Sequence, residues 1–307
     1  MNQDRPVLGI FLMLGFCLTA PLADALAKLL GDKIDIAQLV AFRMGLQVLL
    51  LAPVVWLARL SLRMSRQQVG LSALRAVLHM AGIGMMFLSL RYLPLADAVA
   101  IAFVMPFIML LLGRYVLGET VGQRRILACC VGFLGTLLVM QPSLVQVGWP
   151  ALLPLGVAVD FAVFMLVTRH LAKSVEPIAL QLVSGGLACL LLFPLLPVLS
   201  GLPGFDIAWP TGTTWALVVA MGVLGTGAHL FMTWALRFAP SATLAPMQYL
   251  EIPVAALIGW LIFRDFPNGL ALIGILVTVS AGLYVIAREQ HVAQQARAAQ
   301  TVNAPKA

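Results

Sequence analysis

Two carboxylates, Asp160 and Glu251, lie near the middle of long apolar stretches of this chain. A charge at the centre of a lipid bilayer is costly, so an ionisable residue within a membrane-spanning helix indicates a functional site. At that depth a carboxylate can load and release a proton or bind a cationic group of a substrate. The alternative is a protonated residue that only packs helices together. We expect both residues to take part in substrate binding or ion coupling.

Three more charged residues lie in the first two apolar stretches. Asp24 and Lys28 are four residues apart and share one helix face, and Arg43 lies at a comparable depth on the next stretch. They either neutralise one another as an ion pair or triad, or recognise a charged substrate. Asp97 lies nearer the end of its stretch, where it either caps a helix or serves transport.

Two histidines and two neutral polar residues complete the candidate set. His79 and His229 either relay protons and bind substrate, or are satisfied packing residues. Gln248 and Tyr249 lie about one helical turn before Glu251, so at least one of them can share a cavity face with it. Ordinary hydrogen bonding between helices is the alternative for both.

The elements that position these residues are membrane-spanning helices. Of the 307 residues 62% are hydrophobic and 10% are charged, against about 25% charged in soluble domains, which excludes a soluble fold. Stretches of roughly 20 apolar residues match a hydrocarbon core about 30 Å thick. We predict an all-α protein with ten spans. Their expected bounds are 7–30, 36–58, 70–90, 95–116, 123–140, 149–171, 178–199, 213–236, 241–263 and 269–287.

The net charge of +7 is spread between the apolar stretches, which indicates membrane topology and not a nucleic-acid partner. The four cysteines lie inside apolar stretches with no spacing that suits a metal or a disulfide, so we expect no metal and no cofactor. The first 25 residues imitate a cleaved signal, but further spans follow at once and we expect a retained first helix.

Lys and Arg residues should gather on the cytoplasmic side of the membrane. With a cytoplasmic N-terminus we assign 13 to that side and three to the other, so both termini are predicted to be cytoplasmic. The cytoplasmic set is Arg5, Arg59, Arg63, Arg66, Arg114, Arg124, Arg125, Arg169, Lys173, Arg264, Arg288, Arg297 and Lys306; the other set is Lys33, Arg91 and Arg237.

The chain repeats itself at a spacing of 146 or 147 residues. The matching positions are Arg91-Tyr92-Leu93-Pro94 with Arg237-Phe238-Ala239-Pro240, Glu119 with Asp265, Pro106 with Pro253, Gly122 with Gly269, and Gly135 with Gly282. Five spans per copy would make the second repeat enter from the opposite side, as in many alternating-access transporters. We expect repeats at 1–145 and 146–290, followed by a disordered cytoplasmic tail at 291–307.

Proline and glycine positions indicate where helices bend or touch. Pro106 and Pro253 each remove a backbone hydrogen bond from equivalent helices, which suits a gating helix, although packing alone also produces kinks. Small residues let helices approach closely, either inside one bundle or across a homodimer. The glycines concerned are Gly132, Gly135, Gly274 and Gly282.

These motifs resemble the ten-helix EamA-type branch of the drug/metabolite transporter superfamily. The pattern runs from Phe87 to Gly135, including Gly118-Glu119-Thr120, and again from Trp234 to Gly282. In the second copy Arg264-Asp265-Phe266 replaces the usual Gly-Glu pair. The resemblance implies a central cavity built by the first four helices of each repeat, with the fifth peripheral. It also implies a small-metabolite substrate: an amino-acid-like compound, a nucleotide-like compound or a vitamin such as riboflavin.

A secondary carrier is the function that we expect. The chain has no Gly-x4-Gly-Lys-Ser/Thr loop for a nucleotide, so the energy would come from a gradient, with protons carried by Glu251, Asp160 or Asp24. A membrane-embedded enzyme and a ligand-sensing receptor are the alternatives; there is no paired-histidine metal motif and no Gly-x-Ser-x-Gly turn for the enzyme. Short loops without an organelle address favour a bacterial inner membrane.

Overall fold

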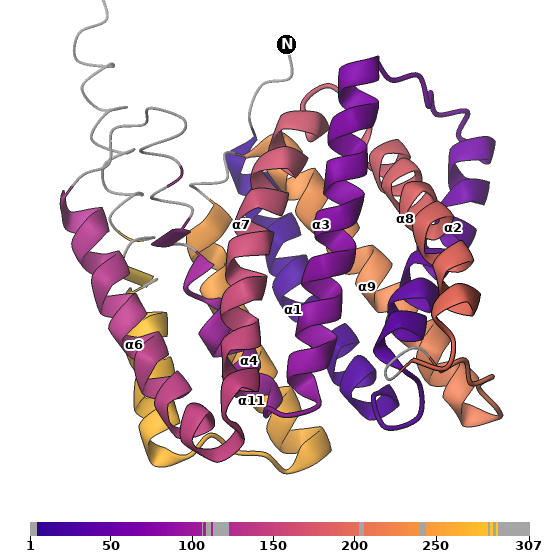
Figure 1. The fold of residues 1–307 in the computed structure, drawn as a ribbon. Coiled ribbons are helices and arrows are strands. Elements are labelled where there is room, and N and C mark those ends of the chain that lie inside the picture. The colour runs from indigo at the N-terminus through magenta and orange to yellow at the C-terminus, as the bar shows by residue number, and fades with distance from the viewer. Residues whose placement is uncertain are drawn as a thin grey trace, which may run out of the picture.

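The computed structural model describes residues 5–105, 107–108, 112, 123–202, 206–239, 244–281, 283–284 and 287. Every regular element in these ranges is a helix (Figure 1). The long helices are α1 (Pro6–Leu30), α2 (Ile36–Leu57), α3 (Arg66–Leu90), α6 (Gln123–Val147), α7 (Leu153–Ala172), α8 (Pro177–Leu199) and α9 (Thr213–Phe238). The short ones are α4 (Leu95–Ala102), η1 (Trp149–Leu152), η2 (Ala245–Leu250), α11 (Glu251–Ile258) and the π-helical turn Gly259–Phe263.

Seven helices of the described part are long and apolar enough to cross a membrane, and two shorter apolar helices cover Met247–Phe263 and Gly269–Ala281. Large apolar side chains such as Trp56 and Val198 point outward from the bundle, where lipid would cover them. The chain is therefore a multi-pass membrane protein. The predicted span 123–140 ends seven residues too early, because α6 continues to Val147.

The two spans that were expected to contain central prolines are broken into short pieces. Pro253 has no N–H to bond the carbonyl of Tyr249, and the residues that precede α11 are wound as the tighter helix η2. The turn Gly259–Phe263 then ends at Arg264, which adopts a left-handed backbone with φ of 61°. In the first half, α4 ends at Ala102, and Pro106 itself lies outside the described residues.

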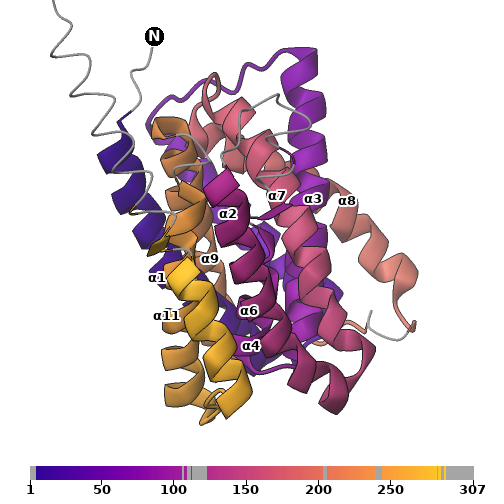
Figure 2. The same cartoon turned by 90° about the vertical axis from the view of Figure 1, so that its left-hand side faces the viewer.

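The helices pack in pairs: α1 against α9, α3 against α7, α2 against α8 and α4 against α11. The pair α2 and α8 lies at one edge of the bundle, and α6 with the helix Gly269–Ala281 lies at the other (Figures 1 and 2). Three apolar clusters fill the spaces between these helices. The middle of the bundle is therefore formed by α1, α3, α4, α7, α9 and α11.

The sides predicted for Arg237 and Arg264 are wrong. The backbone N–H of Arg5 donates to the carbonyl of Phe238 over 2.8 Å, so Arg237 lies at the same end of the bundle as the N-terminus. Lys28 lies 3.3 Å from Asp265, so Arg264 lies at the end where α1 finishes. An odd number of expected spans separates Arg91 from Arg237, which therefore cannot share a side. Exchanging Arg237 and Arg264 leaves the totals of 13 and three unchanged.

The predicted glycine contact forms inside the bundle. A Cβ atom on Gly135 would lie 2.8 Å from the carbonyl oxygen of Gly274, and one on Gly274 would lie 2.5 Å from that of Gly135. The hydroxyl of Thr278 donates to the carbonyl of Gly132 over 3.3 Å across the same contact. Gly282 lies outside the described residues. The homodimer stays a prediction.

We predict that Gly135→Ala destabilises the protein while Gly132→Ala does not. The first change forces two helix backbones apart and should cost about 1–3 kcal/mol, whereas a Cβ on Gly132 finds ordinary contacts at 3.6 Å and 3.7 Å. The measurement is the melting temperature of each purified variant in detergent. Equal melting temperatures for the two variants would contradict this account of the contact.

Candidate functional site

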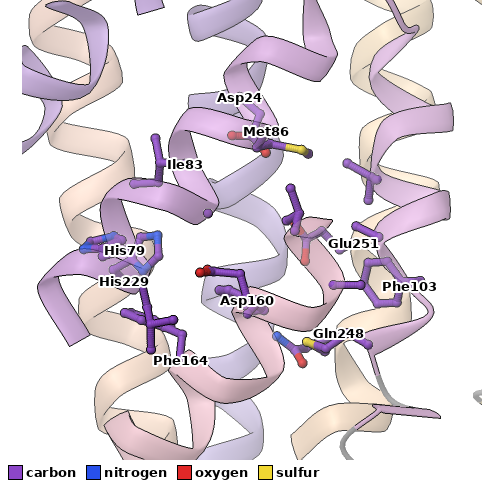
Figure 3. A pocket seen from close by; sticks show the side chains of 18 of the residues that line it. Asp24, His79, Ile83, Met86, Phe103, Asp160, Phe164, His229, Gln248 and Glu251 are labelled. Carbon is purple, nitrogen blue, oxygen red and sulfur yellow. The ribbon is translucent and has the colours of Figure 1, made fainter. Parts of the chain in front are cut away.

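A cavity in the middle of the bundle collects most of the predicted site residues. Side chains of α1, α3, α4, α7, α9, η2 and α11 line it, and the space between them, including its mouth, is about 750 Å³ (Figure 3). The polar residues that line the cavity are Asp24, His79, Asp160, His229, Gln248 and Glu251.

Three carboxylates face this space from three different helices. Asp24 lies on α1, Asp160 on α7, and Glu251 is the first residue of α11 with 9% of its surface exposed. Asp160 approaches α3 at Gly82, where any Cβ atom would collide with the Asp160 carboxylate. Within the described ranges no side chain or backbone group donates a hydrogen bond to these three. They are therefore available to a proton, a cation or a hydroxyl group.

The two histidines form a pair at one side of the cavity. Their ring centroids are 4.2 Å apart, and His79 is only 3% exposed. Neither ring nitrogen of His79 has a hydrogen-bond partner in the described part of the chain, and neither does Nδ1 of His229. A buried polar atom without a partner is unfavourable. These nitrogens are therefore candidates to bind a ligand.

Phenylalanine rings form the wall beside the histidines. Phe161 stacks on Phe16 at 6.1 Å and on Phe164 at 5.8 Å between centroids, and the His79 ring lies 5.1 Å from Phe164. This wall could not be predicted from the sequence, because phenylalanine is common on any membrane helix. Parallel aromatic faces of this kind can stack on a flat ring.

Gln248 and Tyr249 take different roles, although both precede Glu251. Gln248 lines the cavity and is 1% exposed, and its amide nitrogen and oxygen both lack partners among the described residues. Tyr249 does not line the cavity and instead packs its ring 5.2 Å from Phe103, which does. Tyr249 therefore supports the wall that Phe103 forms.

The expected ion triad forms only in part: Asp24 and Arg43 lie close enough for their opposite charges to attract each other, whereas Lys28 pairs elsewhere. The Lys28 ammonium donates to the carbonyl of Leu93 over 2.9 Å and pairs with Asp265, because its long side chain reaches the end of the bundle. Arg43 is buried outside the cavity lining and donates to the Thr226 hydroxyl over 3.4 Å. Direct binding of substrate by these two side chains stays a prediction.

Asp97 does not cap its helix. The N-cap of α4 is Pro94, and one carboxylate oxygen of Asp97 accepts a hydrogen bond from the Ser143 hydroxyl on α6 over 3.1 Å.

Arg75, a fully buried residue of α3, was not among the residues predicted from the sequence. Its guanidinium donates to Thr168 over 2.9 Å and to Ser184 and Gln181 over 2.8 Å each, and it lies 4.7 Å from the centre of the Phe164 ring. The rule that selected Arg43 also applies to Arg75, since both lie in apolar stretches. Arg75 joins α3, α7 and α8 directly behind the aromatic wall and so positions Phe164.

Comparison with known proteins identifies the family. The model of the EamA-like transporter family matches residues 7–141 and again residues 148–288. A riboflavin transporter of Rhizobium johnstonii is 33% identical over 70% of this chain and 69% of its own length. An S-adenosylmethionine uptake transporter of Rickettsia prowazekii is 24% identical over 92% of this chain and 93% of its own.

One solved crystal structure shares the fold, with a TM-score of 0.65 at 19% identity over 94% of this chain and 98% of the other. Family matches that cover both halves, together with the seven long apolar helices, settle the class of protein. The chain belongs to the EamA-like transporter family of the drug/metabolite transporter superfamily, and it is a multi-pass membrane transporter of small molecules and not an enzyme.

Proposed function

We propose that this transporter carries a riboflavin-like metabolite, a flat nitrogen heterocycle with a polar chain, across the bacterial inner membrane by alternating access. The observation that carries the proposal is the cavity, which combines a stacked aromatic wall with three carboxylates that accept no hydrogen bond from the described residues. Stacking of a heterocycle on an aromatic side chain contributes about 1–3 kcal/mol. Relatives named for riboflavin and for S-adenosylmethionine support it, because both compounds contain such a ring and a polar chain.

Alternating access would rest on two inverted five-helix repeats. We infer that α1, α2, α3, the span that begins with α4, and α6 form the first repeat. Then α7, α8, α9, the span of η2 and α11, and the helix Gly269–Ala281 form the second. Exchanging the repeats turns the pair α1–α9 into α7–α3 and leaves the pairs α2–α8 and α4–α11 unchanged, so the packing is compatible with a two-fold axis. The two family matches support boundaries near 1–145 and 146–290; the tail at 291–307 lies outside the described residues.

Matching polar contacts at the two ends of the bundle support the same symmetry. At one end Lys28 of α1 donates to the carbonyl of Leu93, which follows α3. At the other end Arg169 of α7 donates over 2.8 Å to the carbonyl of Ala239, which follows α9.

A second pair of contacts corresponds in the same way. Arg91 pairs with Asp35 at 3.5 Å, and Arg237 pairs with Glu176 at 2.6 Å. Arg91 directly follows the third helix of its repeat and Arg237 lies in the last turn of the third helix of the other, and each acid precedes a second helix. In the proposed orientation both termini are cytoplasmic, so Lys28 and Arg91 lie at the periplasmic end.

We predict that transport is coupled to protons through the cavity carboxylates. Glu251→Gln and Asp160→Asn should each reduce accumulation of riboflavin in proteoliposomes with a proton gradient towards the level of empty liposomes, because an amide cannot load a proton. Exchange of labelled for unlabelled riboflavin should persist, since it needs no net proton movement. Asp32→Asn, outside the cavity, is the control. Wild-type accumulation that survives collapse of the gradient would contradict the coupling.

We also predict that the cavity beside Asp160 has no room for one more methyl group. Gly82→Ala should weaken riboflavin binding about 10-fold to 100-fold, because a Cβ there displaces the carboxylate. Gly84→Ala on the same helix is the matched control, as its Cβ would lie 4.0 Å from its nearest neighbour, the side chain of Val40. Fluorescence titration of riboflavin gives both dissociation constants. Equal constants for the two variants would contradict the placement of the substrate beside Asp160.

The contact between Lys28 and Asp265 should hold the periplasmic end closed, because it joins α1 of the first repeat to the loop after α11 of the second. Lys28→Ala should speed labelling of a cysteine placed at Val99, in a background without native cysteines, by an impermeant thiol reagent in intact cells. A partly exposed ion pair contributes about 1 kcal/mol or less, so we expect up to a fivefold change.

Exchanging the two charges, as Lys28→Asp with Asp265→Lys, should restore slow labelling. Arg91→Ala is the matched control, because its partner Asp35 belongs to the same repeat. Equal acceleration by Lys28→Ala and Arg91→Ala would contradict a closing role that is specific to the contact between repeats.

A further inference from the structure

We propose that Gln248 reads the hydrogen-bonding edge of the substrate ring, pairing through both atoms of its amide. This inference rests on the proposed function and makes it more specific. It names a class of ring: a fused heteroaromatic system that carries an adjacent hydrogen-bond donor and acceptor on one edge.

Leaving the buried amide of Gln248 without hydrogen-bond partners carries a cost in free energy. Its side chain is 1% exposed, and neither amide atom has a partner among the described residues. Each buried polar group without a partner costs about 1–3 kcal/mol. Gln38 and Gln248 differ in this respect: the Gln38 amide donates to the carbonyl of Ala208 over 2.8 Å and accepts from its N–H over 3.0 Å. A partner that arrives with the ligand would relieve the cost at Gln248.

The position of Gln248 points its amide at the contents of the cavity. It lies on η2 one turn before Glu251, and Figure 3 shows Gln248 and Phe103 on the other side of Asp160 from His79 and His229. Phe103 is held from behind by the Tyr249 ring at 5.2 Å. A ring that meets the Gln248 amide with its edge would extend across the cavity towards the aromatic wall of Phe161 and Phe164.

The chemistry of the amide selects the edge. A carboxamide presents an N–H donor and a carbonyl acceptor side by side in one plane, and it pairs with an edge that offers an acceptor beside a donor. The pyrimidine edge of a flavin, with C4=O beside N3–H, has this pattern, and so does the N6–H and N7 edge of adenine. A carboxylate only accepts hydrogen bonds and would pair with the amide N–H alone. An ammonium group only donates them and would pair with the amide oxygen alone.

The remaining polar groups would then meet the rest of the substrate. Asp24, Asp160 and Glu251 can accept hydrogen bonds from the hydroxyl groups of a ribityl chain, and the histidine pair can bind the polar atoms that stay exposed. Recognition would thus be divided between Gln248, which identifies the ring, and the carboxylates, which hold the chain.

The test combines one change in the protein with one change in the ligand. Dissociation constants of riboflavin and 3-methylriboflavin are measured by quenching of flavin fluorescence for the wild type and for Gln248→Met. Methylation removes the N3–H donor and should weaken wild-type binding about 10-fold to 100-fold, the discrimination expected of a two-point amide pair. Gln248→Met should weaken riboflavin binding by a similar factor and make the protein nearly indifferent to the methyl group.

A matched variant separates recognition from folding. Gln38→Met removes a paired amide, so it should lower the melting temperature while keeping the full preference for riboflavin over its methyl derivative. Gln248→Met should leave the melting temperature unchanged or raise it, because no protein hydrogen bond is lost. A lower melting temperature with an unchanged methyl preference would assign Gln248 a structural role and overturn the proposal.

The outcomes also distinguish this proposal from the one on which it rests. Tight riboflavin binding with the same methyl penalty in the wild type and in Gln248→Met would overturn edge reading alone. Equal binding of the two flavins by the wild type would do the same, whether or not the variant folds. Failure of the wild type to bind either flavin would overturn the riboflavin-like substrate class itself.

Discussion

The structure depends on one constraint: inside a membrane, polar groups must find their partners within the protein. Helices satisfy the backbone, but every polar side chain needs a partner of its own. Arg75 meets this requirement with four neutral oxygen acceptors from α7, α8 and α9. His79 and Gln248 do not meet it in the described part of the chain, and both face the central cavity. Single buried atoms of Arg43, Gln47, Asp97 and Gln181 also lack partners among the described residues, but in His79 and Gln248 every polar side-chain atom does.

The same constraint explains why the broken helices lie at the cavity. A helix that runs unbroken offers no backbone groups and only one side-chain face. The short helices α4 and α11, with η2 before α11, bring Phe103, Gln248 and Glu251 to one space. Such breaks are tolerated where the backbone is enclosed by protein, and α1, α3, α7 and α9 enclose it here. The peripheral pair of α6 and the helix Gly269–Ala281 can therefore pack tightly through glycines.

Sequence reasoning predicted the parts that depend on length and on rare residue types. Apolar length placed α1, α2 and α8 within about two residues of their observed ends, and the cost of burying charge selected Asp24, Asp160 and Glu251. The direction in which a side chain points could not be predicted, because the depth of a residue along a helix does not determine it. For this reason Lys28 was wrongly expected to lie with Asp24 and Arg43. The aromatic wall of Phe16, Phe161 and Phe164 gives no signal in a chain so rich in apolar residues.

The contacts at the ends of the bundle correspond between the two halves of the chain, whereas the residues of the cavity do not. Arg91 and Arg237, with their acidic partners, correspond between the two halves and lie at opposite ends of the bundle. The cavity residues have no such counterparts: by the spacing of the prolines Glu251 corresponds to Val104, and by that of the arginines His229 corresponds to Ile83. Two repeats with matching contacts can give the protein two conformations of similar energy, one open to each side of the membrane. In each conformation one end of the bundle makes the contacts that the other end makes in the second conformation. Since the recognition groups occur once, both states present the same single site, and a substrate bound there need not move for access to change sides.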